Sequence, residues 1–172
     1  MAGNKSAFAE LLESVVIAVI LATVIRFFLF QPFYIPSGSM EPTLSPGDRI
    51  IVNKLTYRFS EPNRGDVIVF KYPLDPQKDY IKRVVAVAGE RVEIRNSEVY
   101  VNGEAIGEPY LPEGLVFNDF GPVEVPRDSY FVMGDNRNNS QDSRVWGALP
   151  EQNVIGKAVL VFWPLGRLGL IR

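Results

Sequence analysis

The sequence predicts a mainly β protein in which an N-terminal transmembrane helix precedes a compact mixed β-sheet, barrel-like domain. The first observation is one long apolar stretch, Leu11–Phe30, in a chain of 172 residues. The second is that, after Pro36, β-branched and aromatic runs alternate with clusters of Gly, Pro, Asn and Asp, which is typical of many short strands. We therefore expect an N-terminal tail at 1–10, an anchor at 11–30 and a β domain at 31–172.

The apolar stretch fits a membrane anchor best. Between residues 15 and 25 only Thr23 is polar, and about 20 helical residues span the roughly 30 Å of a bilayer core. A cleaved signal peptide is disfavoured, because no basic region beyond Lys5 precedes the stretch and no small-X-small site follows it. A buried core helix is the alternative, since the uninterrupted run is short. Gln31-Pro32 ends the helix, because proline disfavours its continuation.

Strand signals continue along the rest of the chain. Asn102-Gly103 is a strong hairpin turn signal, with a strand expected on either side. Residues 107–126 are rich in proline and show little periodicity, so we expect 96–126 to be a short excursion from the core. The expected strands are Arg49–Lys54, Asp66–Tyr72, Tyr80–Val87, Arg91–Arg95, Glu98–Val101, Glu104–Ile106, Tyr130–Met133 and Gly156–Trp163.

Composition excludes several classes of protein. The chain has no cysteine and no histidine, which removes disulfides, thiolate metal sites and the commonest zinc ligand. We therefore expect no metal and no cofactor. With 18 basic and 20 acidic residues the net charge is −2, which gives no case for binding nucleic acid. A hydrolase of this composition cannot use a Ser-His-Asp triad or a Cys-His pair, whereas a serine activated by a neutral lysine is possible.

Two segments could supply such a serine and lysine. Ser37-Gly38-Ser39 lies in a turn-like run, and Lys82 lies in the apolar strand expected over Tyr80–Val87. In that strand Tyr80, Lys82 and Val84 share one face, so the lysine has an aromatic and a β-branched neighbour. Burial there would lower its pKa from the reference value of about 10.4 and favour a neutral amine. Taken alone, such segments are more often an ordinary turn and a solvent-facing strand lysine.

Four motifs follow the apolar stretch in a defined order. They are Ser39-Met40-Glu41-Pro42-Thr43-Leu44, Arg64-Gly65-Asp66, Tyr80-Ile81-Lys82-Arg83, and Gly134-Asp135-Asn136 with Asp142-Ser143-Arg144. Together they resemble the boxes of the type I signal peptidases, a family of Ser-Lys serine proteases, and the resemblance covers nearly the whole chain. It implies the minimal, single-anchor form with a signal-peptidase-type β domain, because only one apolar segment is present and residues 87–133 form a short connection.

The resemblance implies roles for particular residues in and beside these motifs. Ser39 would be the nucleophile and Lys82 the general base. The Ser39 N–H and the Ser37 hydroxyl would stabilise the oxyanion, at about 2.7–4 kcal/mol of barrier each. Ser140 would orient the Lys82 amine, and Tyr80 would pack beside it.

The same resemblance implies ion pairs that support the site. Asp142 and Arg144 would pair with each other, while Asp135 and Arg137 would help to hold the same loop. A calcium-binding loop is the alternative interpretation of this oxygen-rich segment, but it lacks the glycine and the glutamate that an EF-hand loop requires. No residue is therefore assigned as a metal ligand.

The implied activity is that of a membrane-bound serine endopeptidase that removes N-terminal signal peptides from exported preproteins after small residues, at Ala-X-Ala type sites. The expected partners are those preproteins and the lipid bilayer, with no nucleic acid, and the protein is expected to be a monomer. The substrate would bind as an added strand. Aromatic residues at 33–34 and 162–163 are candidates to rest at the membrane interface.

The expected location is the plasma or inner membrane, crossed once, with the catalytic domain on the outer side; a thylakoid membrane is also possible. One rival function is another Ser-Lys protease, such as a self-cleaving repressor or a mitochondrial inner-membrane peptidase. A second is a membrane-tethered β domain that binds peptides without cutting them.

Overall fold

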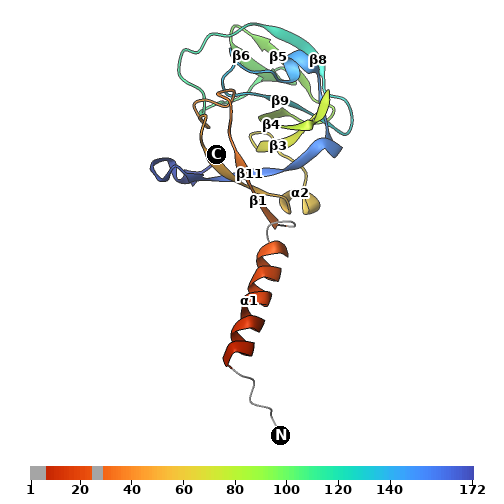
Figure 1. Cartoon of the computed structure of the whole chain (residues 1–172). Coiled ribbons are helices and arrows are strands. Elements are labelled where there is room, and N and C mark those ends of the chain that lie inside the picture. The colour runs from red at the N-terminus through yellow and green to blue at the C-terminus, as the bar shows by residue number, and fades with distance from the viewer. Residues whose placement is uncertain (1–6, 25–28) are drawn as a thin grey trace.

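The computed structural model describes residues 7–24 and 29–172 and shows a β-rich body with a separate N-terminal helix (Figure 1). Helix α1, Ala7–Val24, stands apart from the body, and residues 8–23 are exposed. Within these described ranges, no helix is both long and apolar enough to cross a membrane. Residues 25–28 of the anchor expected at 11–30 lie outside the described residues. Phe30, the expected last residue of that anchor, instead begins strand β1, Phe30–Tyr34.

The larger of two sheets has eight strands and forms the centre of the body. Its hydrogen-bonded order is β1-β2-β11-β3-β4-β9-β10, and β12 also pairs with β11. The further strands are β2 Arg49–Asn53, β3 Val67–Tyr72, β4 Asp75–Ala86, β9 Ser129–Met133, β10 Leu149–Pro150, β11 Val154–Trp163 and β12 Gly169–Leu170. Strand β4 lies between β3 and β9, but β9 pairs with it only from Arg83 onward, so residues 79–82 are paired on the β3 side alone.

A smaller sheet of four strands, in the order β7-β6-β5-β8, covers one side of this body (Figure 1). Its strands are β5 Arg91–Arg95, β6 Glu98–Val101, β7 Glu104–Ala105 and β8 Phe120–Glu124. Asn102 and Gly103 both have positive φ, at 54° and 87°, as a two-residue hairpin requires. The segment expected as an excursion, 96–126, therefore supplies three of the four strands of this second sheet, β6, β7 and β8. Short helices complete the fold: α2 Thr56–Phe59, α3 Ser143–Trp146, η2 Glu151–Asn153 and η3 Leu165–Arg167.

The mainly β fold predicted from the sequence is confirmed, but two five-residue strands, β1 and β8, were not predicted. Strand β1 contains Pro32 and strand β8 contains Pro122. Each lies at the edge of its sheet. An edge strand tolerates proline because one side of its backbone needs no hydrogen-bond donor. These two prolines, which disfavoured strands in the sequence, thus lie in one edge strand of each sheet.

The buried side chains form three apolar clusters. One cluster, around Ile50, Val52 and Val69, also includes Met40 and Leu44 from the segment between β1 and β2. This contact matters for the site, because two fully buried side chains anchor that segment against the larger sheet.

Candidate active site

Strand β4 places Lys82 in the interior. Its register partner on β3 is Ile68, and the lysine is only 3% exposed, so it is not a solvent-facing strand lysine. The Nζ atom lies 5.5 Å from the centre of the Tyr80 ring. Burial lowers the pKa of Lys82 to about 8, although the carboxylates of Asp142 and Asp135 act in the opposite direction. A neutral amine is therefore accessible at mildly alkaline pH.

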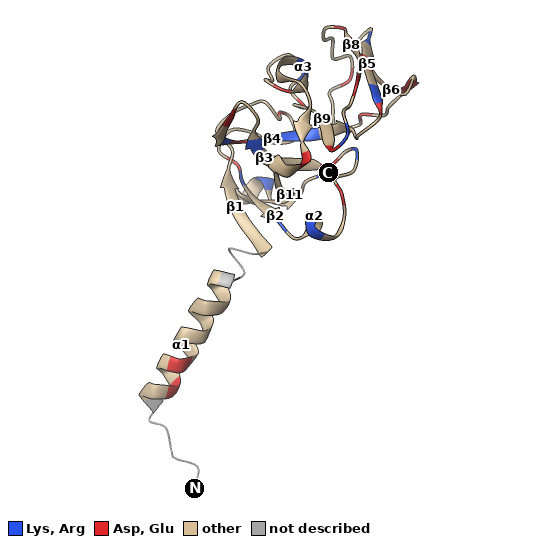
Figure 2. Ribbon diagram, turned by 90° about the vertical axis from the view of Figure 1, so that its right-hand side faces the viewer, with Lys and Arg blue, Asp and Glu red and all other residues tan. Residues whose placement is uncertain are grey.

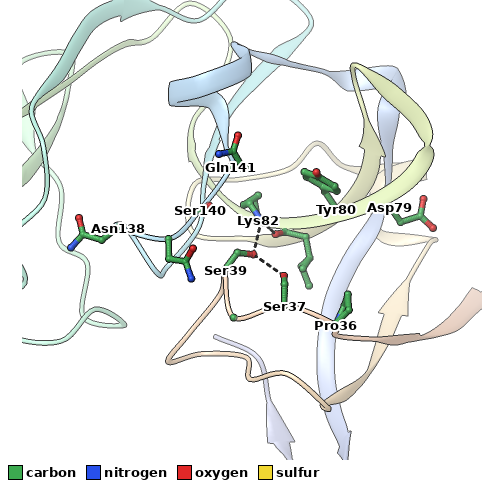
Figure 3. A pocket seen from close by; sticks show the side chains of 12 residues that line it. Pro36, Ser37, Ser39, Asp79, Tyr80, Lys82, Asn138, Ser140 and Gln141 are labelled. Carbon is green, nitrogen blue, oxygen red and sulfur yellow. Dashed lines mark hydrogen bonds between the residues drawn. The ribbon is translucent and has the colours of Figure 1, made fainter.

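The segment between β1 and β2 brings Ser39 to this lysine. Lys82 Nζ donates a hydrogen bond of 2.8 Å to Ser39 Oγ and another of 2.8 Å to the Ile81 carbonyl (Figure 3). Met40 and Leu44 hold the segment in place, since both are fully buried. Once the amine is neutral, its lone pair can accept the Ser39 hydroxyl proton along the same contact.

A second hydroxyl and an asparagine complete the surroundings of Ser39. Ser37 Oγ lies 3.5 Å from Ser39 Oγ (Figure 3). The Asn136 N–H donates to the Ser39 carbonyl at 3.1 Å, and the Asn136 side-chain amide donates to the Gly38 carbonyl at 3.0 Å. The serine backbone is thus fixed from a segment almost a hundred residues later in the chain.

The serine, the lysine and the second hydroxyl open into one cavity of about 480 Å³. The lining residues come from the segment after β1, from β4 and from the segment after β9 (Figure 3): Pro36, Ser37, Gly38, Ser39, Asp79, Tyr80, Ile81, Lys82, Asn138, Asn139, Ser140 and Gln141. A cavity with a serine hydroxyl and a buried amine in contact on its wall is a suitable place for covalent catalysis.

Asp142 and Arg144 form an ion pair of 2.8 Å beside the site. Burial favours the neutral acid, but the hydrogen bonds and charge of Arg144 and the Gly134 N–H keep the pKa of Asp142 below its ordinary value. The Gly134 N–H donates to this carboxylate at 3.0 Å. Asp142 also accepts from the Arg144 N–H as the N-cap of α3. The pair therefore ties the end of β9 to the start of α3.

Asp135 and Arg137 lie in the same segment, but their side chains have separate partners. Asp135 accepts two hydrogen bonds from buried Arg83, at 2.9 and 2.7 Å, and one of 2.5 Å from Thr43. Arg137 forms a bidentate ion pair with Glu108, from the segment between β7 and β8. The supporting ion pairs thus extend well outside the loop that carries them.

Ser140 lines the cavity with Lys82. Its Oγ is buried and makes no hydrogen bond of ordinary geometry among the residues that the structure describes, but it lies close enough to Asp142 to help lower the pKa of that carboxyl group. The contact with Lys82 that the sequence resemblance implied is therefore not formed here. Close packing nevertheless fixes Ser140, because a Cβ built on Gly134 would lie 2.2 Å from its Oγ.

Metal chemistry finds no support in this region. In the described part of the chain, no group of three or more acidic side chains could hold a metal ion. The carboxylates that suggested a calcium loop are engaged instead by arginines, Asp135 by Arg83 and Asp142 by Arg144.

Sequence reasoning missed four residues that shape the site. Arg83 and Asn136 lie inside recognised motifs, next to residues that were assigned roles, and Thr43 lies in the serine motif, so position alone could have flagged them. Glu108 lies in a proline-rich stretch with no periodicity. Its selection depends on tertiary contact with Arg137, for which the sequence carries no local signal.

Comparison with known proteins gives one consistent result. Residues 8–163 match the family described as signal peptidase, peptidase S26. The chain is 43% identical to a probable signal peptidase I-2 of Synechocystis, covering 97% of this chain and 78% of that protein. It is 38% identical to a signal peptidase I of Bacillus amyloliquefaciens, covering 96% and 93%. A solved signal peptidase I from Enterococcus faecalis aligns with a TM-score of 0.50 and 30% identity, over 57% of this chain and 97% of that one.

Proposed function

This chain belongs to the signal peptidase family, peptidase S26, and from that premise we propose that Ser39 and Lys82 form the catalytic dyad of a membrane-bound signal peptidase. The chain is a serine hydrolase of this family. The observation that carries the dyad is the 2.8 Å contact between Lys82 Nζ and Ser39 Oγ, made by a lysine whose pKa burial lowers to about 8.

The proposed reaction begins when neutral Lys82 accepts the Ser39 proton as the Oγ attacks the scissile carbonyl. Negative charge develops on the carbonyl oxygen, where the Ser39 N–H and the Ser37 hydroxyl donate hydrogen bonds. The Lys82 ammonium then protonates the departing amine, which leaves an ester on Ser39. Lys82, neutral again, takes a proton from water as the water oxygen attacks the ester. The Lys82 ammonium then returns this proton to Ser39 Oγ, which leaves as the hydroxyl and releases the signal peptide as a carboxylic acid.

An extended substrate has a free strand edge to bind. Strand β3 pairs with β4 from Asp79 to Arg83, but β9 pairs with β4 only from Arg83 onward. The β9-side edge of residues 79–82 therefore borders the cavity, opposite residues 36–39. We place the residues before the cleaved bond along this edge as an added strand. We propose that this edge accepts small side chains before the cleaved bond, such as those of Ala-X-Ala sites.

Exposed apolar side chains support a membrane location. Charge in α1 is confined to Glu10 and Glu13 near its N-terminal end (Figure 2), and its apolar side chains face solvent. Apolar residues of the body are also exposed, among them Trp163 at 49% and Leu165 at 69%. Exposed apolar surface of this extent is unusual on a soluble monomer. We propose that α1 belongs to a single-pass anchor of the plasma membrane, or of a thylakoid membrane, with the β body on the outer side as a monomer.

The direct test is cleavage of a preprotein. Purified protein in detergent should cut a preprotein with an Ala-X-Ala site, and mass spectrometry of the product should locate the cut directly after the second alanine. Ser39→Ala, which removes only the nucleophilic oxygen, should bind the preprotein without cutting it. Cleavage retained in Ser39→Ala would reject the dyad, and binding without cleavage by the wild type would favour a tethered peptide-binding domain.

A further inference from the structure

We propose that Glu108, in the segment between β7 and β8, is a positioning residue that fixes the geometry of Ser39 and Lys82 through Arg137 and Gly134. This inference rests on the proposed function, because it concerns the same dyad. It assigns the segment 107–117 a role in catalysis beyond completing the smaller sheet.

Glu108 holds Arg137 through two hydrogen bonds inside the protein. Arg137 Nη1 donates to one carboxylate oxygen at 2.8 Å and Nη2 donates to the other. The side chain of Arg137 is 0% exposed and that of Glu108 is 9% exposed. The Tyr110 hydroxyl donates a third hydrogen bond to this carboxylate at 2.6 Å. A planar, two-pronged pair of this kind fixes orientation as well as position.

Arg137 passes this constraint to Gly134. Its Nε donates to the Gly134 carbonyl at 3.2 Å, while the Gly134 N–H donates to Asp142. A Cβ at Gly134 would lie 2.4 Å from the Ser39 carbonyl oxygen and 2.6 Å from Ser140 Cβ. Gly134 therefore touches the nucleophile's backbone and the cavity wall at once, and a shift of Gly134 must move one of them.

The same segment makes a second contact beside the lysine. The Tyr110 ring stacks on buried Arg83, with the guanidinium carbon 3.7 Å from the ring centre. Arg83 follows Lys82 in β4 and forms the buried ion pair with Asp135. Glu108 thus holds Arg137 while Tyr110 stacks on Arg83, so one segment contacts both buried arginines.

Loosening this contact should change the titration of Lys82. The charged and titratable groups that face Lys82 are Asp135 and Asp142 after β9 and Tyr80 on β4. The segment before β2 contributes the hydroxyl of Ser39, and β3 contributes an apolar register partner. If Arg137 is released, the segment 134–142 that packs beside Lys82 loosens and water reaches the amine. Because burial has the largest effect on this amine, the Lys82 pKa then rises toward its ordinary value.

The test compares Glu108→Gln with a matched control, Asp66→Asn. Asp66 is also a largely buried carboxylate that accepts from a cation, Lys157, and from a tyrosine hydroxyl, Tyr57, but its side chain contacts nothing in 134–142. Both variants should lower the melting temperature. Only Glu108→Gln should lower kcat, by about 10- to 100-fold with KM changed less than about threefold.

The second readout does not need activity. Carbon-13 NMR of Cε-labelled lysines, with Lys82→Met to assign the signal, follows the Lys82 titration in each variant. The midpoint should rise by about half a pH unit or more in Glu108→Gln and stay at the wild-type value in Asp66→Asn. Tyr110→Phe, which keeps the ring on Arg83 and removes only the hydroxyl, should give a smaller rise and serves if Glu108→Gln does not fold.

Two results would overturn the inference. One is a Lys82 midpoint that stays at the wild-type value in Glu108→Gln, or in Tyr110→Phe if that is the folded variant. The other is an equal change in Asp66→Asn, which would show a general loss of stability. Failure of the wild type to cleave a preprotein would instead reject the proposed function, and the NMR comparison would still decide the role of Glu108.

Discussion

Replacing Lys82 by methionine should inactivate the protein and at the same time make it more stable. The side chains are similar in length, but methionine carries no charge, and the site that holds Lys82 is only 3% exposed. A pKa lowered from 10.5 to about 8 means that the folded protein disfavours the ammonium form relative to the unfolded chain. At about 1.4 kcal/mol per pH unit, this disfavours folding by roughly 3 kcal/mol when both states are protonated.

The sign of this effect sets its pH window. Below about pH 8 the lysine is charged in both states and the full penalty applies. Between about 8 and 10.5 the unfolded chain binds more protons, so the stability of the wild type rises with pH and the penalty vanishes. Lys82→Met should therefore exceed the wild type by roughly 3 kcal/mol at pH 7, less the hydrogen bonds lost, and by almost nothing at pH 10.5.

Urea unfolding followed by tryptophan fluorescence measures this difference at pH 7, 9 and 10.5. Tyrosines and the other lysines titrate in both proteins, so their contributions cancel in the comparison. A stability difference between the two proteins that stays constant across this range would refute the claim that Lys82 is buried at a cost. Activity of Lys82→Met on a preprotein would refute its role as the base.

Three further outcomes follow from the geometry. Gly134→Ala places a methyl carbon 2.4 Å from the Ser39 carbonyl oxygen. The resulting shift of the Ser39 backbone, approaching 1 Å, should lower kcat by about 100-fold. In the control Gly156→Ala the methyl would lie 2.5 Å from the Asn53 carbonyl oxygen, so this variant should lose stability and keep kcat within about threefold. Ser37→Ala should lower kcat by about 10²–10³-fold with little change in KM, and an unchanged kcat would remove it from the oxyanion site. The pH profile of kcat/KM should rise through about 8, the pKa of Lys82, and a limb near 6.5 would point to a different base, since the chain has no histidine.

The parts of the fold that follow local rules could be predicted from the sequence. The Asn102-Gly103 hairpin forms at the predicted position, and the strand Arg91–Arg95 has the predicted bounds. The edge strands were missed, because proline is a negative signal unless the sheet order is known. Strand β4 begins at Asp75, earlier than predicted, because polar residues there extend a hairpin with β3 that is exposed at its tip.

The candidate site divides in the same way. Ser39 and Lys82 could be proposed from motif order, and they lie in direct contact in the structure. The partners of Asp135 and Arg137 could not, since ion pairing in a folded chain depends on which segments tertiary structure brings together. Arg83 and Glu108 are separated from those partners by 52 and 29 positions, and no short-range pattern encodes contacts at such spacing.

The burial of Lys82 has a consequence for timing. One wall of its cavity is open along residues 79–82 and 36–39 until a peptide occupies it. A docked strand would cover this open wall, and greater exclusion of water would lower the pKa of Lys82 further. Under the proposed mechanism, Lys82 would be neutral more often when a substrate is bound and protonated more often when the cavity is empty. Binding of a peptide would thus itself increase the fraction of neutral Lys82. At neutral pH the reaction would then be limited to polypeptides that bind along the strand edge.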